Sequence, residues 1–299
     1  MEEPILIYNI FHEHPFGLPI AIYFYMTGMS AGSFLISTMS YGMGIKKFKP
    51  LGKVGVVLAT LLLVLAPLNL IIDLGQPLRF WHLFPYMNFK SAITWGSSLL
   101  VAYPLNCMIY GYFMFKGDAK LTKMFGLIGI PLAISVHGYT GFILALIKAR
   151  ALWNTALMPI YFLVSAMVSG IALMILVTFI QDLVRKEKKL NVDLAADLGK
   201  ILSITIIFDL FLVLSDVLVL LNADSEAKEG AAMLLTGSFQ PYFLGVEIIL
   251  GSIIPLFLLL FPFTRRNPVT LSLASILAMI GVFAMRYVMV MGGMSLHLS

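Results

Sequence analysis

The chain has 299 residues, of which 60% are hydrophobic and only 12% are charged, and its mean hydropathy is +0.96. A soluble domain would be roughly a quarter charged, so this composition excludes an ordinary soluble protein and predicts an integral membrane protein. The formal net charge of +5 comes from basic residues between the apolar stretches. It therefore indicates membrane topology, and we expect no nucleic-acid partner.

Eight apolar stretches are long enough for a membrane-spanning helix, which needs about 20 residues. They cover residues 18–42, 52–73, 92–115, 123–147, 157–183, 200–221, 241–263 and 270–291. We expect an all-α integral membrane protein with eight transmembrane helices in two four-helix bundles. Residues 1–183 would form the first bundle together with span 5, residues 184–199 a cytoplasmic linker, and residues 200–299 the rest of the second bundle.

The basic residues are unevenly shared between the two ends of the predicted spans. Fourteen follow spans 1, 3, 5 and 7, five lie on the opposite side, and Arg286 lies inside the last span. Because Lys and Arg concentrate in cytoplasmic loops, both termini should lie outside the cytoplasm. We expect a multi-pass protein of the cytoplasmic membrane, the inner membrane of a cell that has two.

Histidine and cysteine are too sparse for this protein to hold redox metals by itself. Only His137 of the five histidines lies well inside a span, whereas a b-type haem between membrane helices usually takes two axial histidines. The single cysteine, Cys107, cannot ligate an iron–sulfur cluster alone, because such clusters need several thiolates. We therefore expect no haem and no metal site in this protein.

Charged residues inside a bilayer are costly and usually face a partner or a cavity. Asp209 and Asp216 are seven residues apart, hence on one face of a helix, and Glu247 and Arg286 lie in the following spans. These four residues form a predicted buried network. Two interpretations stay open: an ion-pair network that joins spans 6, 7 and 8, or a proton path.

A second predicted cluster lies near the non-cytoplasmic side and contains His14, Asp73, His137 and Tyr139. A quinone head group needs hydrogen-bond donors to its carbonyls, and its two protons need acceptors, which a histidine, a tyrosine and an acid can supply. The alternatives are an ordinary interfacial role for His14 and a hydrogen-bonded core role for His137.

Small residues recur at helical spacing in two of the spans. They occupy Gly28, Gly32 and Ser33 in span 1, and Ser165, Ser169 and Gly170 in span 5. Small residues at such spacing let membrane helices approach closely, so these stripes predict helix packing.

Several stretches together resemble the NrfD/polysulfide reductase membrane subunit family. They are Pro19–Phe34 in span 1; Asp73-Leu-Gly-Gln-Pro-Leu-Arg-Phe-Trp81 after span 2; Ser91-Ala-Ile-Thr-Trp-Gly-Ser97 at the start of span 3; His137-Gly-Tyr-Thr-Gly141 in span 4; Leu152-Trp-Asn-Thr155, with Pro159 and Phe162–Ala166 after it; and Arg286-Tyr-Val with Gly292-Gly293 in span 8. The stretch from Asp73 to Ser97 is the most specific of these.

This resemblance implies a haem-free subunit that exchanges electrons between the quinone pool, menaquinone or another quinone, and an extracytoplasmic iron–sulfur protein. That partner would carry four cubane clusters and often serve a molybdopterin catalytic subunit. It would dock over the outer loops at about 74–91, 148–157 and 222–239.

The resemblance also implies a quinone pocket on the extracytoplasmic side of the first bundle. Its residues match His14, with Asn9 nearby, and Tyr139, while His12 competes with His14. Tyr139 would orient a carbonyl oxygen of the quinone, and His14 or Asp73 would receive a proton. Asp73 and Arg79 fit either the site or the turn that they flank.

Two rival functions remain open at this stage. The first is a transporter or ion-translocating subunit that uses the network of Asp209, Asp216, Glu247 and Arg286. The second is a passive membrane anchor for extracytoplasmic subunits.

Overall fold

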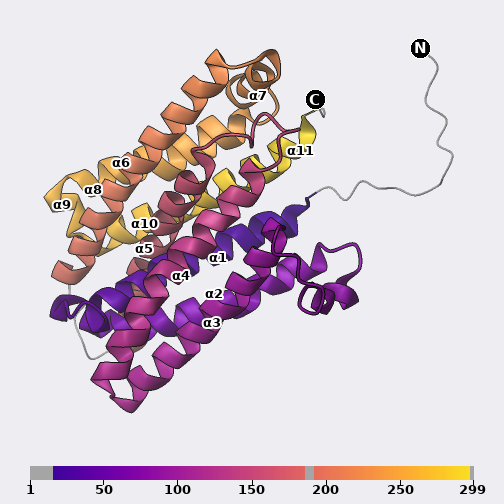
Figure 1. The fold of residues 1–299 in the computed structure, drawn as a ribbon. Coiled ribbons are helices and arrows are strands. Elements are labelled where there is room, and N and C mark those ends of the chain that lie inside the picture. Colours follow the sequence, from indigo (N-terminus) through magenta and orange to yellow (C-terminus); the bar gives the residue numbers. More distant parts are fainter. Residues whose placement is uncertain (1–15, 186–191, 297–299) are drawn as a thin grey trace, which may run out of the picture.

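The computed structural model describes residues 16–185 and 192–296, and within these ranges every regular element is a helix (Figure 1). Eight helical spans in them are long and apolar enough to cross a membrane, which confirms the predicted all-α membrane protein. The spans are α1 (Leu18–Tyr41), α2 (Lys49–Ile72), α3 (Ala92–Lys116), α4 (Ala119–Ala145), α5 (Met158–Arg185), α6 (Val192–Asn222), η3 with α8 (Pro241–Ile253 and Ile254–Leu260), and α10 with η4 and α11 (Pro268–Tyr287, Val288–Gly292 and Gly293–Ser295).

Four short helices lie in the connections between the spans: η1 (Lys46–Phe48), η2 (Pro77–Leu83), α7 (Ser225–Leu235) and α9 (Pro262–Arg265). The sequence predicted residues 222–239 only as an outer loop, whereas α7 forms there. Its apolar face is buried through Ala227, Ala231 and Leu234. A short amphipathic helix of this kind is too polar to stand out as a membrane span.

Part of the stretch predicted as a cytoplasmic linker, residues 184–199, is helical. Helix α5 continues to Arg185 and α6 begins at Val192, so only residues 186–191 fall outside the described helices. Leu194 and Leu198 are buried in the core, which explains why this charged stretch is helical. The division of the chain into domains remains a prediction.

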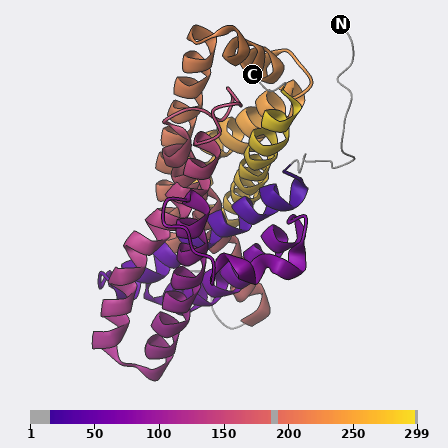
Figure 2. The ribbon, with the colours of Figure 1, turned by 45° about the vertical axis from the view of Figure 1, so that its right-hand side comes forward.

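Helix α1 lies at the centre of the fold and packs against α2, α4, α5 and α10. Figure 2 shows it (indigo) beside the last helices (yellow). A side chain at Gly32 would overlap the backbone at Gly170 of α5, and Gly28 faces Ala166 of the same helix. The prediction that these small residues allow close helix packing is therefore confirmed.

The remaining contacts form two rings of helices. Helices α1 to α4 pack in the pairs α1–α2, α2–α3, α3–α4 and α1–α4, and α5, α6, α8 and α10 form a similar ring. Because α1 also packs tightly against α5, and α4 against α5, the rings share a large interface. Their separation into two four-helix bundles stays a prediction.

Two ion pairs join connections at the end of the molecule that carries most of the basic residues. Lys47 of η1 pairs with Asp197 of α6, and Arg266 pairs with Asp193 at 3.6 Å. All four side chains are substantially exposed, so each pair contributes at most about 1 kcal/mol. Which side of the membrane this end faces remains the prediction made from charge.

Candidate functional site

Asp73 ends α2 and lies against the beginning of α1. A Cβ atom built on Gly17, the residue before α1, would lie 2.8 Å from Asp73 Oδ1. The first backbone N–H groups of a helix have no partner within it and favour a nearby negative charge. Asp73 is thus placed to stabilise the start of α1. Asn9, His12 and His14, which precede Gly17 in the sequence, lie outside the described residues.

Tyr139 of α4 lies flat against the start of α3. Its ring and hydroxyl occupy the space that a side chain at Gly96 would fill, so only glycine fits there. Tyr139 is only half-buried, which leaves part of the ring open to a neighbouring molecule.

Asp73 lies at Gly17, where α1 begins, and Tyr139 lies against Gly96, near the start of α3. The structure thus places these two predicted site residues at the same end of the first ring of helices.

His137 lies in a different environment from Tyr139, although it is only two residues away. Its Nδ1 and Nε2 atoms each lie 2.6 Å from a backbone carbonyl oxygen, those of Ala133 and Thr27 respectively. The ring is buried and packs edge-on against Tyr103. Residues two apart point to different sides of a helix. His137 thus links α4 to α1, and no ring nitrogen remains free for a ligand.

The predicted buried network lies inside the other ring of helices. Asp209 and Asp216 of α6, Glu247 of η3 and Arg286 of α10 have exposed fractions between 1% and 6%. Within the described residues no carboxylate oxygen lies within ion-pair distance of Arg286. The direct ion pair expected under one interpretation of the sequence therefore does not form there.

Arg286 is held by α5. Its Nη2 atom donates to the Phe162 carbonyl oxygen at 3.0 Å and to Ser165 Oγ at 2.8 Å. The guanidinium also lies over the Phe162 ring, 3.7 Å from its centre, a cation–π arrangement. These contacts stabilise the buried guanidinium without a hydrogen bond to a carboxylate.

Glu247 receives a hydrogen bond from Tyr161, whose hydroxyl donates to Oε1 at 2.5 Å. Helix η3 is π-helical, and the Ser252 hydroxyl donates to the Glu247 carbonyl oxygen. π-Helical turns often occur at functional sites. The sequence did not single out Tyr161, although it lies one turn before Ser165 in a stretch noted for its small residues.

Several polar atoms of this cluster have no hydrogen-bond partner in the described part of the chain. They are Asp209 Oδ1, Asp216 Oδ1, Glu247 Oε2, Arg286 Nε and Arg286 Nη1. Buried polar atoms are nearly always paired in proteins. So many polar atoms without a hydrogen-bond partner on neighbouring side chains indicate a site where protons or water bind.

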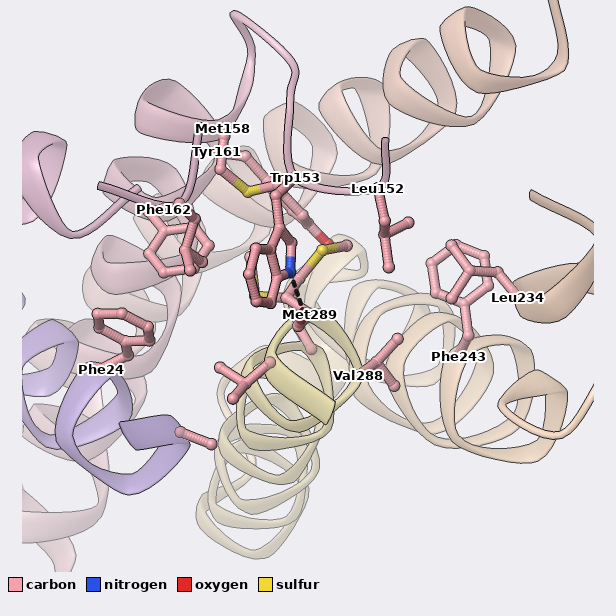
Figure 3. Close-up of a cluster of buried hydrophobic side chains, with 14 of the residues drawn as sticks. Phe24, Leu152, Trp153, Met158, Tyr161, Phe162, Leu234, Phe243, Val288 and Met289 are labelled. Atoms are coloured by element: carbon pink, nitrogen blue, oxygen red, sulfur yellow. Dashed lines mark hydrogen bonds between the residues drawn. The ribbon is translucent and has the colours of Figure 1, made fainter. Parts of the chain in front are cut away.

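The segment between α4 and α5 is fastened to the end of the protein. Trp153 is buried and its Nε1 donates to the Met289 carbonyl oxygen at 2.5 Å (Figure 3). Arg150 Nη1 donates to the carbonyl oxygens of Gly293, Met294 and Leu296. An arginine at the C-terminus of a helix satisfies carbonyls that have no partner within the helix. The segment is thus held rigidly over the buried cluster.

Among the described residues, no three His, Cys, Asp or Glu side chains come together as a metal site would require. The protein is thus an eight-span membrane protein in which polar side chains gather in two regions. One region lies at the start of α1, and the other is buried between α5, α6, η3 and α10.

The comparison with protein families identifies the particular family. The sequence model of "Polysulphide reductase, NrfD" matches residues 8–296, so the chain belongs to this family of membrane proteins. The resemblance seen in the sequence is confirmed.

Curated relatives agree with this assignment. The C subunit of selenate reductase from Mesobacillus selenatarsenatis is 31% identical over an alignment that covers 92% of this protein and 72% of the relative. The C component of polysulfide reductase from Wolinella succinogenes is 32% identical, covering 52% of this protein and 55% of the relative. The Hdr-like menaquinol oxidoreductase integral membrane subunit of Archaeoglobus fulgidus is 30% identical, covering 54% and 41%. The alignment thus spans only about half the length of the latter two.

Proposed function

We propose that this protein is the quinone-linked membrane subunit of a respiratory oxidoreductase. The observation that supports this most directly is the position of Asp73 and Tyr139 at the same end of the first ring of helices, against the starts of α1 and α3, in a family whose relatives include a menaquinol oxidoreductase membrane subunit. Menaquinone or another quinone would bind there, with His14 and Asn9 completing the site from the segment before Gly17.

Each residue has a defined role in this proposal. The Tyr139 hydroxyl orients a quinone carbonyl oxygen, and the Asp73 carboxylate or the His14 imidazole accepts a proton when quinol is oxidised. The bound quinone would supply the two-electron chemistry. The positions of His137 nitrogens against backbone carbonyls favour a positioning role, in which His137 fixes α4 and thereby Tyr139.

The electrons would pass to an extracytoplasmic iron–sulfur subunit with four clusters, and from there to a molybdopterin catalytic subunit. Selenate reductase and polysulfide reductase, the complexes named for two relatives, are consistent with such partners. The exposed side chains of η2 and the residues after it, among them Trp81 and Tyr86, offer a docking surface on the outer loops. In this arrangement both termini lie outside the cytoplasmic membrane.

Substitution of Tyr139 by Phe tests the quinone site. We expect Tyr139→Phe to abolish quinol-linked turnover of the purified complex while subunit assembly stays intact, because the variant loses only the hydroxyl. Tyr112→Phe is a matched control, since Tyr112 is 61% exposed on α3 and should not alter turnover. Normal quinol oxidation by an assembled Tyr139→Phe complex would refute this pocket.

A second function is favoured by the buried cluster of Asp209, Asp216, Glu247 and Arg286. Its open polar atoms support a role in proton transfer, in addition to the quinone chemistry at the other site. We propose that these carboxyl groups take up and release protons during turnover. Glu247→Gln should then diminish proton uptake by the complex while electron transfer from quinol is retained.

A further inference from the structure

A small pocket opens at the end of α6 that lies beside α7. It has a volume of about 170 Å³ and is lined by the segment between α4 and α5, the end of α6 and the start of α7. Its polar lining comes from Lys148, Asn154, Thr155, Asp224 and Glu226. At about 30 Å³ per molecule, the pocket has room for roughly five waters.

Helix α6 connects this pocket with the buried carboxyl groups. Its residue Leu220 lines the pocket together with Thr155 and lies one helical turn after Asp216. Asp216 in turn lines a narrow crevice that also borders Tyr161. The other walls of the crevice are apolar and include Phe243, seen with Tyr161 in Figure 3.

Beyond the crevice the polar groups continue to the middle of the membrane span. Tyr161 donates its hydrogen bond to Glu247, and Asp209 is buried on the same face of α6 as Asp216, two turns away. The open oxygens of Asp216, Glu247 and Asp209 are buried. Buried proton-binding groups therefore extend from the pocket toward Glu247.

The series of buried carboxyl groups ends at Asp209, on the side of the basic end of the molecule. Toward the basic end of the molecule, α6, α8 and α10 meet in an apolar cluster that contains Leu202, Ile206, Leu259 and Ala278. The hydroxyls of Ser203 and Ser275, which are also buried there, donate to carbonyl oxygens of their own helices, and no buried carboxyl group follows on this side among the described residues. The polar route thus opens toward one end of the described helices.

We propose that the pocket beside α7 is the outer mouth of a one-sided proton route that runs through Thr155, Asp216 and Tyr161 to Glu247 and Asp209. A hydrated proton in the pocket protonates the Asp216 carboxylate. Tyr161 then passes its hydroxyl proton to Glu247 and regains one from Asp216, so that one proton moves inward and the phenol stays neutral. No electrons are transferred in these steps.

This route deepens the proposed proton role of the buried carboxyl groups, rests on it, and does not depend on the quinone site. It assigns the pocket and Tyr161 to proton transfer, and it fixes the side from which protons arrive. Given the predicted orientation, protons would exchange with the extracytoplasmic side.

Blocking the pocket beside α7 with a bulky label tests the proton route. Ala223 lines the pocket, whereas Ser225 is exposed nearby and is not part of the lining. In purified complexes, Ala223→Cys and Ser225→Cys would each be labelled with a bulky, membrane-impermeant thiol reagent. The only native cysteine, Cys107, is fully buried, and labelled wild-type complex controls for it.

The readout is the rate at which the infrared band of the protonated Glu247 carboxyl shifts after transfer into D₂O. The band is assigned by its loss in Glu247→Gln. We expect the label at position 223 to slow the shift at least tenfold and the label at position 225 to leave it unchanged. Tyr161→Phe, without any label, should slow the same shift.

The outcomes separate the two proposals. A Glu247 band that shifts at the wild-type rate with the label at position 223 would overturn the mouth while leaving the proton role intact. The absence of any exchangeable band lost in Glu247→Gln would overturn the proton role itself, and the route with it. Slowing only with the label at position 223 supports both.

Discussion

The position of Gly96 under the Tyr139 ring gives a sharp test of the proposed quinone site. A methyl group at Gly96 would overlap the ring, so in Gly96→Ala the ring must move by roughly 1.5 Å to restore van der Waals separation. A misplacement of about 1 Å at a reacting group can lower a rate by about 10²-fold. We therefore expect quinol-linked turnover to fall by about that factor, although every hydroxyl and carboxyl group of the site is retained.

The stability of the fold should change much less than its activity. Overpacking usually costs about 1–3 kcal/mol, and the low end applies here because the half-buried Tyr139 ring can swing outward. Gly138→Ala is the matched control, because a Cβ at Gly138 meets no atom within 4 Å. Steady-state turnover and thermal unfolding of both purified variant complexes give the comparison. Wild-type turnover in Gly96→Ala would refute the assignment of Tyr139 to the site.

Two further predictions concern the buried contacts that hold the second polar region. Trp153→Phe removes the donor to the Met289 carbonyl oxygen and should lower the free energy of unfolding by about 1–3 kcal/mol; an unchanged thermal midpoint would contradict this. Ser165→Ala removes one acceptor of Arg286, a hydrogen bond to a charged group worth about 1.5–3 kcal/mol. It should lower the midpoint of thermal unfolding, whereas Ser97→Ala, at a serine whose hydroxyl bonds only to the Ile93 carbonyl oxygen of its own helix, should not.

The spans could be predicted from the sequence because hydropathy reports burial in lipid directly. All eight were identified, including those broken by proline, such as α2 with Pro67 and α4 with Pro131. The boundaries were less accurate where a helix extends into water. The first turns of α6 and the whole of α7 bury one apolar face and expose a charged one, so mean hydropathy does not reveal them.

The residues of the buried cluster were predictable, but their partners were not. An acid or an arginine within an apolar span must be buried with other polar groups, and this alone identified Asp209 and Arg286. Tyr161 could not be found in this way, because phenols are common at both buried and lipid-facing positions. The helical periodicity used for the sequence also assumes 3.6 residues per turn, whereas Glu247 lies in a π-helical segment that turns by a smaller angle per residue.

His137 shows a different limit of the sequence. Its position in an apolar span suggested either a ligand-binding ring or a core residue, and only the structure places carbonyl oxygens of Ala133 and Thr27 against its two nitrogens. Thr27 belongs to α1, 110 residues earlier in the sequence. Such a contact depends on how two helices cross, which hydropathy does not encode.

The placement of Arg286 explains how the cluster can remain open to protons. A salt bridge to Asp209 or Glu247 would occupy the carboxylate oxygens and hold them in one state. Instead, α5 supplies a carbonyl oxygen, a hydroxyl and the Phe162 ring to the guanidinium, and no carboxylate oxygen of the described residues lies within ion-pair distance of it. The positive charge thus stays near the carboxyl groups without using their oxygens. A buried acid held in this way can exchange a proton without first breaking an ion pair, which is the property that a proton route through the membrane requires.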